Sequence, residues 1–425
     1  MSSDWVETVF SDLCVITRGA SPRPIHDWMT DGDGIPWVKI SDATATNSRF
    51  IGKTSGKIKK DGASRSVEVF QGDLILSNSA TPGIPRFMRI NACIHDGWLL
   101  LRDFRGATKE YLYYLLVVER PKLVAQGNGS VFTNLKTDIL KNHRVCLPPL
   151  QEQKAIAHIL GTLDDKIELN RKINETLEAM AKALFKSWFV DFDPVRAKAD
   201  GRPTGLPAEI SDLFPDSFED SELGEIPSGW SVRRLRDFIK PVKDRQGDRN
   251  IEEYSATVTG IEPRDSRFKK NLSSSGDKNK VALEGDLVFG LSRRTINFGR
   301  MAQPIGAFSS VYEVFRSISG STISTKIVEQ CIRSRISEFM VILKPAAREG
   351  QAIDREVLMD QLIADFPEQL SAKLETLLEP VSKRVELGSE HIFALEQLRN
   401  ALLPKLISGE IRIPDAEKML EEVGV

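Results

Sequence analysis

Two stretches of similar pattern decide the fold: QEQKAIAHILGTLDDKIELNRKINETLEAMAKALFKSW at residues 151–188 and QLSAKLETLLEPVSKRVELGSEHIFALEQLRNALLPKL at residues 369–406. Apolar residues of the first stretch match apolar residues of the second at a constant separation of 218 residues, as at Ile156 and Leu374. Within each stretch the apolar residues recur at alternating steps of four and three, which is the spacing of a coiled-coil seam. Both stretches are therefore predicted to form long helices that bury an apolar stripe.

The two matched stripes predict that the helices pair with each other. Antiparallel packing about a pseudo-twofold axis is the most economical way to bury both stripes. A helix of about 36 residues is a rod of about 54 Å. The residues predicted to form this helix–helix spacer are Ile156, Leu160, Leu163, Ile167, Leu177 and Leu184 in the first stretch and Leu374, Leu378, Val381, Val385, Leu395 and Leu402 in the second.

Polar and small residues interrupt both seams. Asn170 and Asn174 stand in the first seam, where polar residues can fix register and partner number, unless they simply face solvent. Gly388 and Arg399 stand in the second seam. Beyond the first seam, the aromatic residues of 185–192 exceed what two helices can cover. This excess indicates either a surface for a partner chain or packing on the adjacent domain.

A second repeat lies upstream of each helix. VEVFQGDLILSNS at 67–79 resembles NKVALEGDLVFGLS at 279–292, with the Gly-Asp-Leu tripeptides aligned. Trp5 and Trp230 each precede an apolar stretch. The chain thus reads as domain, long helix, domain, long helix, with a linker rich in Pro, Gly, Ser and Asp. The predicted segments are a first domain at 1–150, a helix at 151–196, the linker at 197–226, a second domain at 227–367, and a helix with tail at 368–425.

Charge is segregated along the chain, although 58 basic and 60 acidic residues give a net charge of only -2. Residues 1–150 hold 19 basic and 15 acidic side chains, and residues 227–367 hold 23 and 18. The helical segments are acidic, with 9 basic and 16 acidic side chains in 151–226 and 7 and 11 in 368–425. Basic domains on acidic helices suit a polyanion bound at two places, because phosphate neutralisation supplies sequence-independent affinity for nucleic acid.

Loops that follow the two Gly-Asp-Leu turns carry the side chains expected of a DNA reader. Arg reads guanine and Asn reads adenine, whereas Ser and Thr fit phosphates. The same residue types form ordinary loops, so both interpretations stay open for the first loop, while the Arg pair favours DNA contact for the second. A third loop, residues 127–134, either approaches a phosphate or precedes a helix cap. The candidate DNA-binding residues are Ser77, Asn78, Ser79, Thr81, Arg86, Ser130, Thr133, Asn134, Ser292, Arg293, Arg294, Asn297 and Arg300.

The sequence lacks motifs for catalysis or for a metal. Residues 52–57 do not fit the P-loop frame, and residues 193–195 are not the tetrapeptide of adenine methyltransferases. The five His form no catalytic or ligand motif, and the four Cys lie far apart, which suggests neither a zinc site nor disulfides. The longest apolar run, 111–118, is far shorter than the roughly 20 residues that cross a bilayer. We therefore expect a non-catalytic, cytoplasmic protein that binds no cofactor or metal.

The most specific motif is LPPLQEQKAIA at residues 147–157, followed by LDDKI at 163–167 and Asn170. It resembles the central conserved region of the specificity subunits of type I restriction-modification systems. The two Gly-Asp-Leu turns and the Gly-Trp start of the second domain are similar to that family as well, so the resemblance covers essentially the whole chain. The second copy departs from the pattern, because DFPEQL at 365–370 lacks the double proline. The two helices therefore need not contact partners alike.

The resemblance implies two α/β (α+β) target recognition domains, each followed by a long helix, with the helices paired as an antiparallel coiled coil of pseudo-twofold symmetry. In that family each recognition domain reads one half of a bipartite site in double-stranded DNA, and the helices set the spacer and dock two modification subunits. Those subunits use S-adenosylmethionine to methylate adenine at N6, and two restriction subunits add translocation and cleavage that need ATP and Mg. One specificity subunit serves each complex and is not itself an enzyme.

An assembly scaffold is the alternative interpretation of the same pattern. A coiled-coil tether with two protein-binding domains also needs two matched helices and no catalytic motif. Such a scaffold would bind its partners independently of salt and would leave no DNA footprint. DNA binding therefore discriminates between the two hypotheses.

Overall fold

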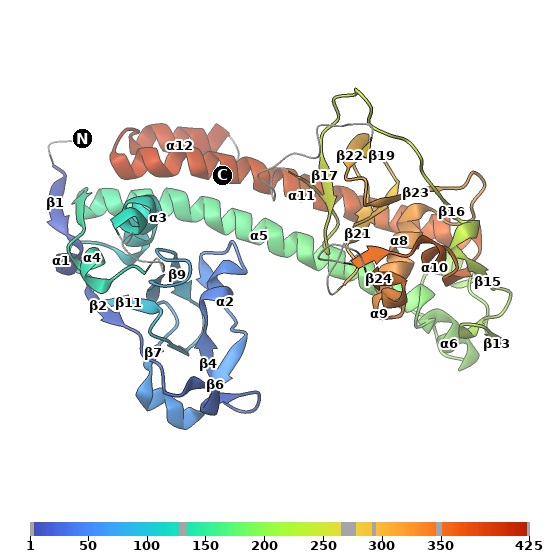
Figure 1. The fold of residues 1–425 in the computed structure, drawn as a ribbon, viewed down its shortest axis with the longest axis horizontal. Coiled ribbons are helices and arrows are strands. Elements are labelled where there is room, and N and C mark those ends of the chain that lie inside the picture. Colours follow the sequence, from blue (N-terminus) through green and yellow to red (C-terminus); the bar gives the residue numbers. More distant parts are fainter. Residues whose placement is uncertain (1–3, 127–133, 265–277, 291–294, 346–350, 423–425) are drawn as a thin grey trace. The chain divides into compact units, whose positions relative to one another are not determined.

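The computed structural model describes the chain in five ranges, 4–126, 134–264, 278–290, 295–345 and 351–422. Its internal contacts divide the chain into two units, one of residues 1–174 with 386–425 and one of residues 175–385. Helices α5 (Leu150–Phe189) and α11 (Glu368–Ser408) each contribute residues to both units (Figure 1). The two predicted long helices are thereby confirmed.

Short strands build the sheets of the first unit. They are β1 (Val6–Val9), β2 (Val15–Arg18), β3 (Met29–Thr30), β4 (Ile35–Val38), β5 (Phe50–Ile51), β6 (Gly56–Ile58), β7 (Val67–Val69), β8 (Leu74–Ser77), β9 (Pro85–Met88), β10 (Ala92–Ile94), β11 (Trp98–Arg102) and β12 (Arg144–Leu147). One five-stranded sheet has the order β2-β11-β8-β9-β5, and the other has the order β3-β6-β4-β10-β7. Neighbours within them are antiparallel, except that β4 pairs with β10 and β5 with β9 in parallel.

Besides α5 and α11, the first unit contains shorter helices. They are α1 (Phe10–Leu13), α2 (Ile40–Thr44), α3 (Lys109–Gln126), α4 (Thr137–Lys141) and α12 (Ile413–Glu422). Helix α3 lies beside the first half of α5, and its buried Tyr111 and Leu116 share one core with Leu160 (Figure 1). Ala416 and Leu420 of α12 are buried in the same core. A single apolar core therefore fixes the first sheet domain on its helices.

In both units, a strand near the start of the sheet domain pairs with the strand that directly precedes the long helix. In the first unit, β1 near the N-terminus pairs antiparallel with β12, the strand that directly precedes α5. In the second unit, β15 (Ser231–Arg234) pairs antiparallel with β26 (Leu362–Asp365), the strand that directly precedes α11. The repeat seen in the sequence is thus a repeat of topology, with the strand after each Trp returned to the start of the following helix.

The remaining elements of the second unit are also short. The strands are β13 (Phe218–Ser221), β14 (Gly224–Pro227), β16 (Ile239–Pro241), β17 (Tyr254–Ala256), β18 (Ile261–Pro263), β19 (Lys280–Leu283), β20 (Leu287–Phe289), β21 (Phe298–Arg300), β22 (Ile305–Phe308), β23 (Glu313–Ser317), β24 (Leu343–Pro345) and β25 (Gln351–Ile353). The helices are α6 (Asp193–Ala199), α7 (Ala208–Ser211), α8 (Thr325–Ser334), α9 (Ile336–Phe339) and α10 (Arg355–Met359). The largest sheet has the order β16-β23-β20-β21.

The Gly-Asp-Leu turns have the same structural role in both units. Gly72 and Gly285 adopt left-handed backbone angles, with φ of 91° and 85°, which glycine reaches without strain. In the first unit, the Asp73 carboxylate accepts the Phe70 N–H and an ion pair from Arg102. In the second unit, Asp286 accepts the Leu283 N–H at 2.8 Å and two N–H groups of Arg316 at 2.8 and 2.7 Å. The turns therefore tie the start of β8 to its neighbour β11 in the first unit and the start of β20 to its neighbour β23 in the second.

The two long helices run antiparallel in the first unit. In the first unit, Asp164 contacts Arg399 and Asn174 contacts Ser389, so the order along α5 is opposite to that along α11. The predicted antiparallel pairing is confirmed. Most of the predicted spacer residues are buried, and the others are partly exposed. The buried ones are Ile156, Leu160, Leu163, Ile167, Leu374, Leu378, Leu395 and Leu402, and the partly exposed ones are Leu177, Leu184, Val381 and Val385.

The interruptions of the seam have complementary partners. Asn170 and Asn174 are 9% and 8% exposed, so the alternative that they face solvent is wrong. Asn174 Nδ2 donates to Ser389 Oγ at 3.1 Å, and a Cβ on Gly388 would lie 2.3 Å from Asn174 Oδ1. Gly388 therefore makes room for an asparagine on the opposite helix, and Arg399 reaches the Asp164 carboxylate.

The aromatic residues after the first seam pack inside the second unit. Phe185 and Trp188 are each 1% exposed. Trp188 meets the Phe214 ring edge-on, with the centroids 5.3 Å apart, and Phe189 lies 4.2 Å from the Phe366 ring. Packing on the adjacent domain is therefore the correct alternative for these residues, and they form no partner surface.

The segment predicted as a linker, residues 197–226, is an ordered part of the second unit. It contains α7 and the β13–β14 hairpin, and Ile210, Phe214 and Ile226 are buried in the same core as Phe185. Its Pro, Gly and Ser residues indicated turns correctly, but its few apolar side chains are enough to attach it. The predicted domain boundaries themselves stay a prediction.

Candidate nucleic-acid interface

The first predicted DNA loop follows β8, and two of its side chains are turned inward. Ser77 is fully buried, and its Oγ donates to the Thr81 carbonyl at 2.6 Å. Asn78 is 5% exposed, and its Nδ2 donates to the Asp96 carbonyl at 3.2 Å. These two side chains shape the loop, whereas Ser79 and Thr81 are half-buried. The accessible part of the loop is therefore its tip.

Leu135, which follows the third predicted loop, contacts the first predicted loop. The Leu135 N–H donates to the Asn78 carbonyl at 2.8 Å. Asn134 directly precedes this contact and is exposed. Ser130 and Thr133 lie outside the described residues. Two stretches that are more than 50 residues apart in sequence thus meet at one edge of the first domain.

Arg86 has structural partners within the domain. Its Nη2 donates to the carbonyls of Ala43 and Thr46 at 2.8 and 3.2 Å. Burial lowers the pKa of this guanidinium, and the side chain is half-buried. Arg86 therefore holds the segment after α2 against β9. Its predicted contact with DNA stays a prediction.

The second predicted DNA loop is only partly described. Ser292, Arg293 and Arg294 lie outside the described residues. Asn297 precedes β21, and its carbonyl accepts the Gly290 N–H at 2.8 Å, which closes the base of the loop. Arg300 at the end of β21 is half-buried. The structure thus places the described members of this set on one hairpin, at the position that corresponds to the first loop.

A hollow in the first domain holds further candidate residues that were not predicted from the sequence. It is lined by Arg23, Met29, Trp37, Lys39, His95 and Asp96, among others. Two cations beside an aromatic ring are the side chains expected at a nucleic-acid backbone. The run SPRPIHDW at residues 21–28 mixes basic and aromatic residues and is the signal that could have indicated this site.

His95 is an uncharged hydrogen-bonding group of this hollow. Burial lowers the pKa of its imidazole, although the neighbouring Asp96 and Asp42 carboxylates oppose that shift. Its Nδ1 accepts the Gly97 N–H at 2.8 Å, so the proton of the neutral ring resides on Nε2. Asp96 itself accepts hydrogen bonds from Ser21 Oγ at 2.6 Å and Arg23 Nη2 at 3.1 Å. The hollow therefore contains a neutral donor, the Nε2–H group of His95, together with the charged side chains of Arg23 and Asp96.

The chain is similar to known proteins in both sequence and fold. The family described as "Type I restriction modification DNA specificity domain" matches residues 2–179. The MjaIX type I specificity subunit of Methanocaldococcus jannaschii is 26% identical over 97% of this chain and 94% of its own length. Residues 2–179 thus carry a type I restriction modification DNA specificity domain, and the chain is similar to type I specificity subunits over nearly its whole length.

Further relatives agree with this assignment. The HindI type I specificity subunit of Haemophilus influenzae is 32% identical over 50% of this chain and 46% of its own length. A crystal structure of a type I S subunit from M. genitalium covers 96% of this chain and 97% of its own, with a TM-score of 0.58 at 13% identity, and shares the fold. The predicted resemblance and fold class are confirmed. The description of the matched domain names DNA specificity, and the names of these relatives identify them as specificity subunits.

The described ranges contain neither a membrane-spanning helix nor a cluster of metal ligands. None of the helices there combines the length and the apolar character needed to cross a bilayer. Within the same ranges, no three His, Cys, Asp or Glu side chains gather in a way that could hold a metal ion.

Proposed function

We propose that this specificity subunit reads a bipartite DNA site, with its first sheet domain on one half-site and its second sheet domain on the other. The observation that carries this proposal is the topological repeat, in which β1–β12 and β15–β26 return each domain to the start of a long helix. Two copies of one reader on paired helices match two half-sites on one DNA molecule. The basic excess of both domains supports a polyanionic ligand.

We further propose that α5 and α11 set the spacer between the half-sites and dock two modification subunits. A helix of 40 residues is about 60 Å long, which exceeds the roughly 34–36 Å of one DNA turn. Methylation of adenine at N6 from S-adenosylmethionine, and any ATP- and Mg-dependent cleavage by two restriction subunits, would belong to the partners. One copy of this chain would serve each complex.

The experiment that tests the proposal is methylome sequencing of a host that expresses this chain with its modification subunit. We expect N6-methyladenine at a split motif with one fixed spacer, absent from a host that lacks this chain. Four residues inserted after Asn174 should change the spacer, because they lengthen α5 by about 6 Å. Equal methylation without this chain, or an assembled complex with no motif, would favour the assembly scaffold instead.

A further inference from the structure

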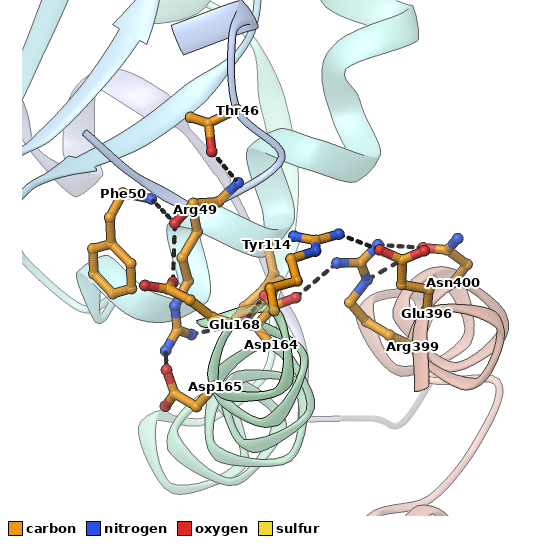
Figure 2. Close-up of polar contacts among 12 residues, drawn as sticks. Thr46, Arg49, Phe50, Tyr114, Asp164, Asp165, Glu168, Glu396, Arg399 and Asn400 are labelled. Atoms are coloured by element: carbon orange, nitrogen blue, oxygen red, sulfur yellow. Dashed lines mark hydrogen bonds and ion pairs between the residues drawn. The ribbon is translucent and has the colours of Figure 1, made fainter. Parts of the chain in front are cut away.

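A carboxylate-rich segment of α5 contacts the first domain. The segment between α2 and β5 lies against α5, where Ser48 Oγ donates to Glu168 Oε2 at 2.9 Å. Arg49 Nη2 donates to Asp165 Oδ1 at 2.5 Å, and Arg89 next to β9 pairs with Glu168. The domain thus presents cations and a hydroxyl to acidic side chains of the helix (Figure 2).

Asp164 joins three elements in one chain of hydrogen bonds. Tyr114 Oη of α3 donates to Asp164 Oδ2 at 2.7 Å, and it accepts Arg49 Nη1 at 3.0 Å. From the other side, Arg399 Nη1 of α11 donates to Asp164 Oδ1 at 2.8 Å (Figure 2). A single carboxylate therefore connects the first sheet domain, the helix that follows it and the helix of the second copy.

Asp164, Glu168 and Arg49 are largely withdrawn from solvent, whereas the Asp165 side chain at the edge of the contact is 63% exposed. The side chains of Asp164 and Glu168 are 11% and 14% exposed, that of Arg49 is 14% exposed, and Tyr114 is 2% exposed. Burial would raise the pKa of Glu168, but hydrogen bonds from Lys172, Ser48 and Arg89 outweigh burial and lower it. A buried carboxylate that loses its partners is strongly destabilised, so each contact favours one orientation of the domain on the helix.

The domain side of this contact is itself held in place. Arg86 bonds the carbonyls of Ala43 and Thr46, so the backbone before Ser48 and Arg49 is tied to β9. Tyr114 stands on α3, in the main core of the unit. Movement of the acidic contacts would therefore move the whole sheet domain and not only a surface loop.

Helix pairing alone does not require these carboxylates. At the 218-residue offset that matches the apolar seams, Ser382 stands where the first copy has Asp164, and Lys383 stands where it has Asp165. The apolar pattern is thus retained in both helices, whereas this part of the acidic pattern belongs to the first copy. Glu386 matches Glu168 at this offset, so Asp164 and Asp165 are the carboxylates particular to the first copy, and all three contact the first domain.

We propose that Asp164, Asp165 and Glu168 are positioning residues that hold the first recognition domain in one orientation on α5 and α11, so that the complex accepts a single spacer length. This inference rests on the proposed reading of a bipartite site. The three carboxylates act through the domain that they hold. Their removal should broaden the set of spacers and leave the sequences of the half-sites unchanged.

The test uses this chain in complex with its modification subunit, and the variant combines Tyr114→Phe with Glu168→Gln. Both substitutions keep the side-chain shape and remove bonds between the domain and α5. The matched control combines Arg171→Gln with Glu396→Gln, which removes an ion pair that joins only the two helices, with side chains 28% and 29% exposed. The readout is methylome sequencing, with complex formation measured by size-exclusion chromatography.

We expect the double variant to methylate the same half-sites at spacers one base pair shorter or longer, at a tenth or more of the level at the original spacer. The control should keep a single spacer. A uniform loss of methylation without new spacers, or an unchanged single spacer, overturns the inference. If the double variant does not assemble, Tyr114→Phe alone is tested by the same criteria. Absence of a split motif with the unmodified chain would contradict the proposed function instead.

Discussion

Gln153 of the PPLQEQ motif should attach the start of α5 to the first domain. The side chain is 1% exposed and makes three hydrogen bonds to backbone groups. Its Nε2 donates to the carbonyls of Pro148 at 2.9 Å and Gly106 at 3.0 Å, and its Oε1 accepts the Thr108 N–H at 3.1 Å. Gln153→Met keeps the length of the side chain and removes all three bonds, so packing changes little while the backbone groups lose their partners.

The expected cost follows from these bonds. A neutral hydrogen bond contributes about 1 kcal/mol net, so the loss of three costs about 3 kcal/mol. Since 1.4 kcal/mol is a factor of ten, the local opening equilibrium should rise by about 100-fold. Hydrogen exchange read by mass spectrometry, under conditions that report this equilibrium, should show the change in peptides that contain Thr108.

Gln151→Met is the matched control, because Gln151 lies on the same helical turn and is exposed. It should leave the exchange of the Thr108 peptides within twofold of the unmodified chain. Equal protection of these peptides in both variants would refute the reasoning, because the three bonds would then not hold the helix start. In that case the motif would owe its presence to contacts with a partner.

Two further outcomes follow from buried charges and thiols. Asp286→Ala should lower the free energy of unfolding by about 1.5–3 kcal/mol in a urea titration, because it removes the charge-assisted hydrogen bonds of a buried carboxylate, while Arg316 is 38% exposed and keeps access to water; Asp73→Ala should cost less, since that carboxylate is 15% exposed against 1%, and equal costs would contradict this ranking. In alkylation at pH 8, Cys146 should react first of the four thiols, as read by peptide mass spectrometry, and earlier labelling of any other would contradict the burial. The other three are buried, which raises the pKa of Cys14 and Cys331 to about 12 and that of Cys93 to about 11.

Sequence reasoning found the elements whose pattern is local. The 4-3 spacing of apolar residues predicted both long helices, and the 218-residue match predicted their pairing, because a helix stripe involves neighbours three and four positions apart. The two Gly-Asp-Leu turns were recognised as a repeat. Their ion pairs were not predicted, since Arg102 and Arg316 stand about 30 positions further along the chain.

Composition was a weaker guide where a few apolar residues decide the packing. The segment 197–226 reads as a linker, yet Phe214 packs on Trp188, and Ile210 and Ile226 are buried in the same core. Ser77 and Arg86 have the residue types of DNA contacts, but their bonds to backbone carbonyls within the domain became visible only in three dimensions. The residue type limits which groups a side chain can bind, but its burial and its bonds within the domain determine whether it is available to DNA.

By itself, the sequence determined two basic domains, each followed by a long helix, and the antiparallel pairing of those helices. Only the tertiary structure decided what Asp164 does, because its partners Tyr114 and Arg399 are 50 and 235 positions away. The same holds for Gly388, whose place in the seam is explained by Asn174 on the opposite helix. The burial pattern of a helix depends on residues that are close in sequence. The desolvation cost of a buried charge is instead offset by a partner that the fold brings within about 3 Å, and that partner can lie anywhere in the sequence.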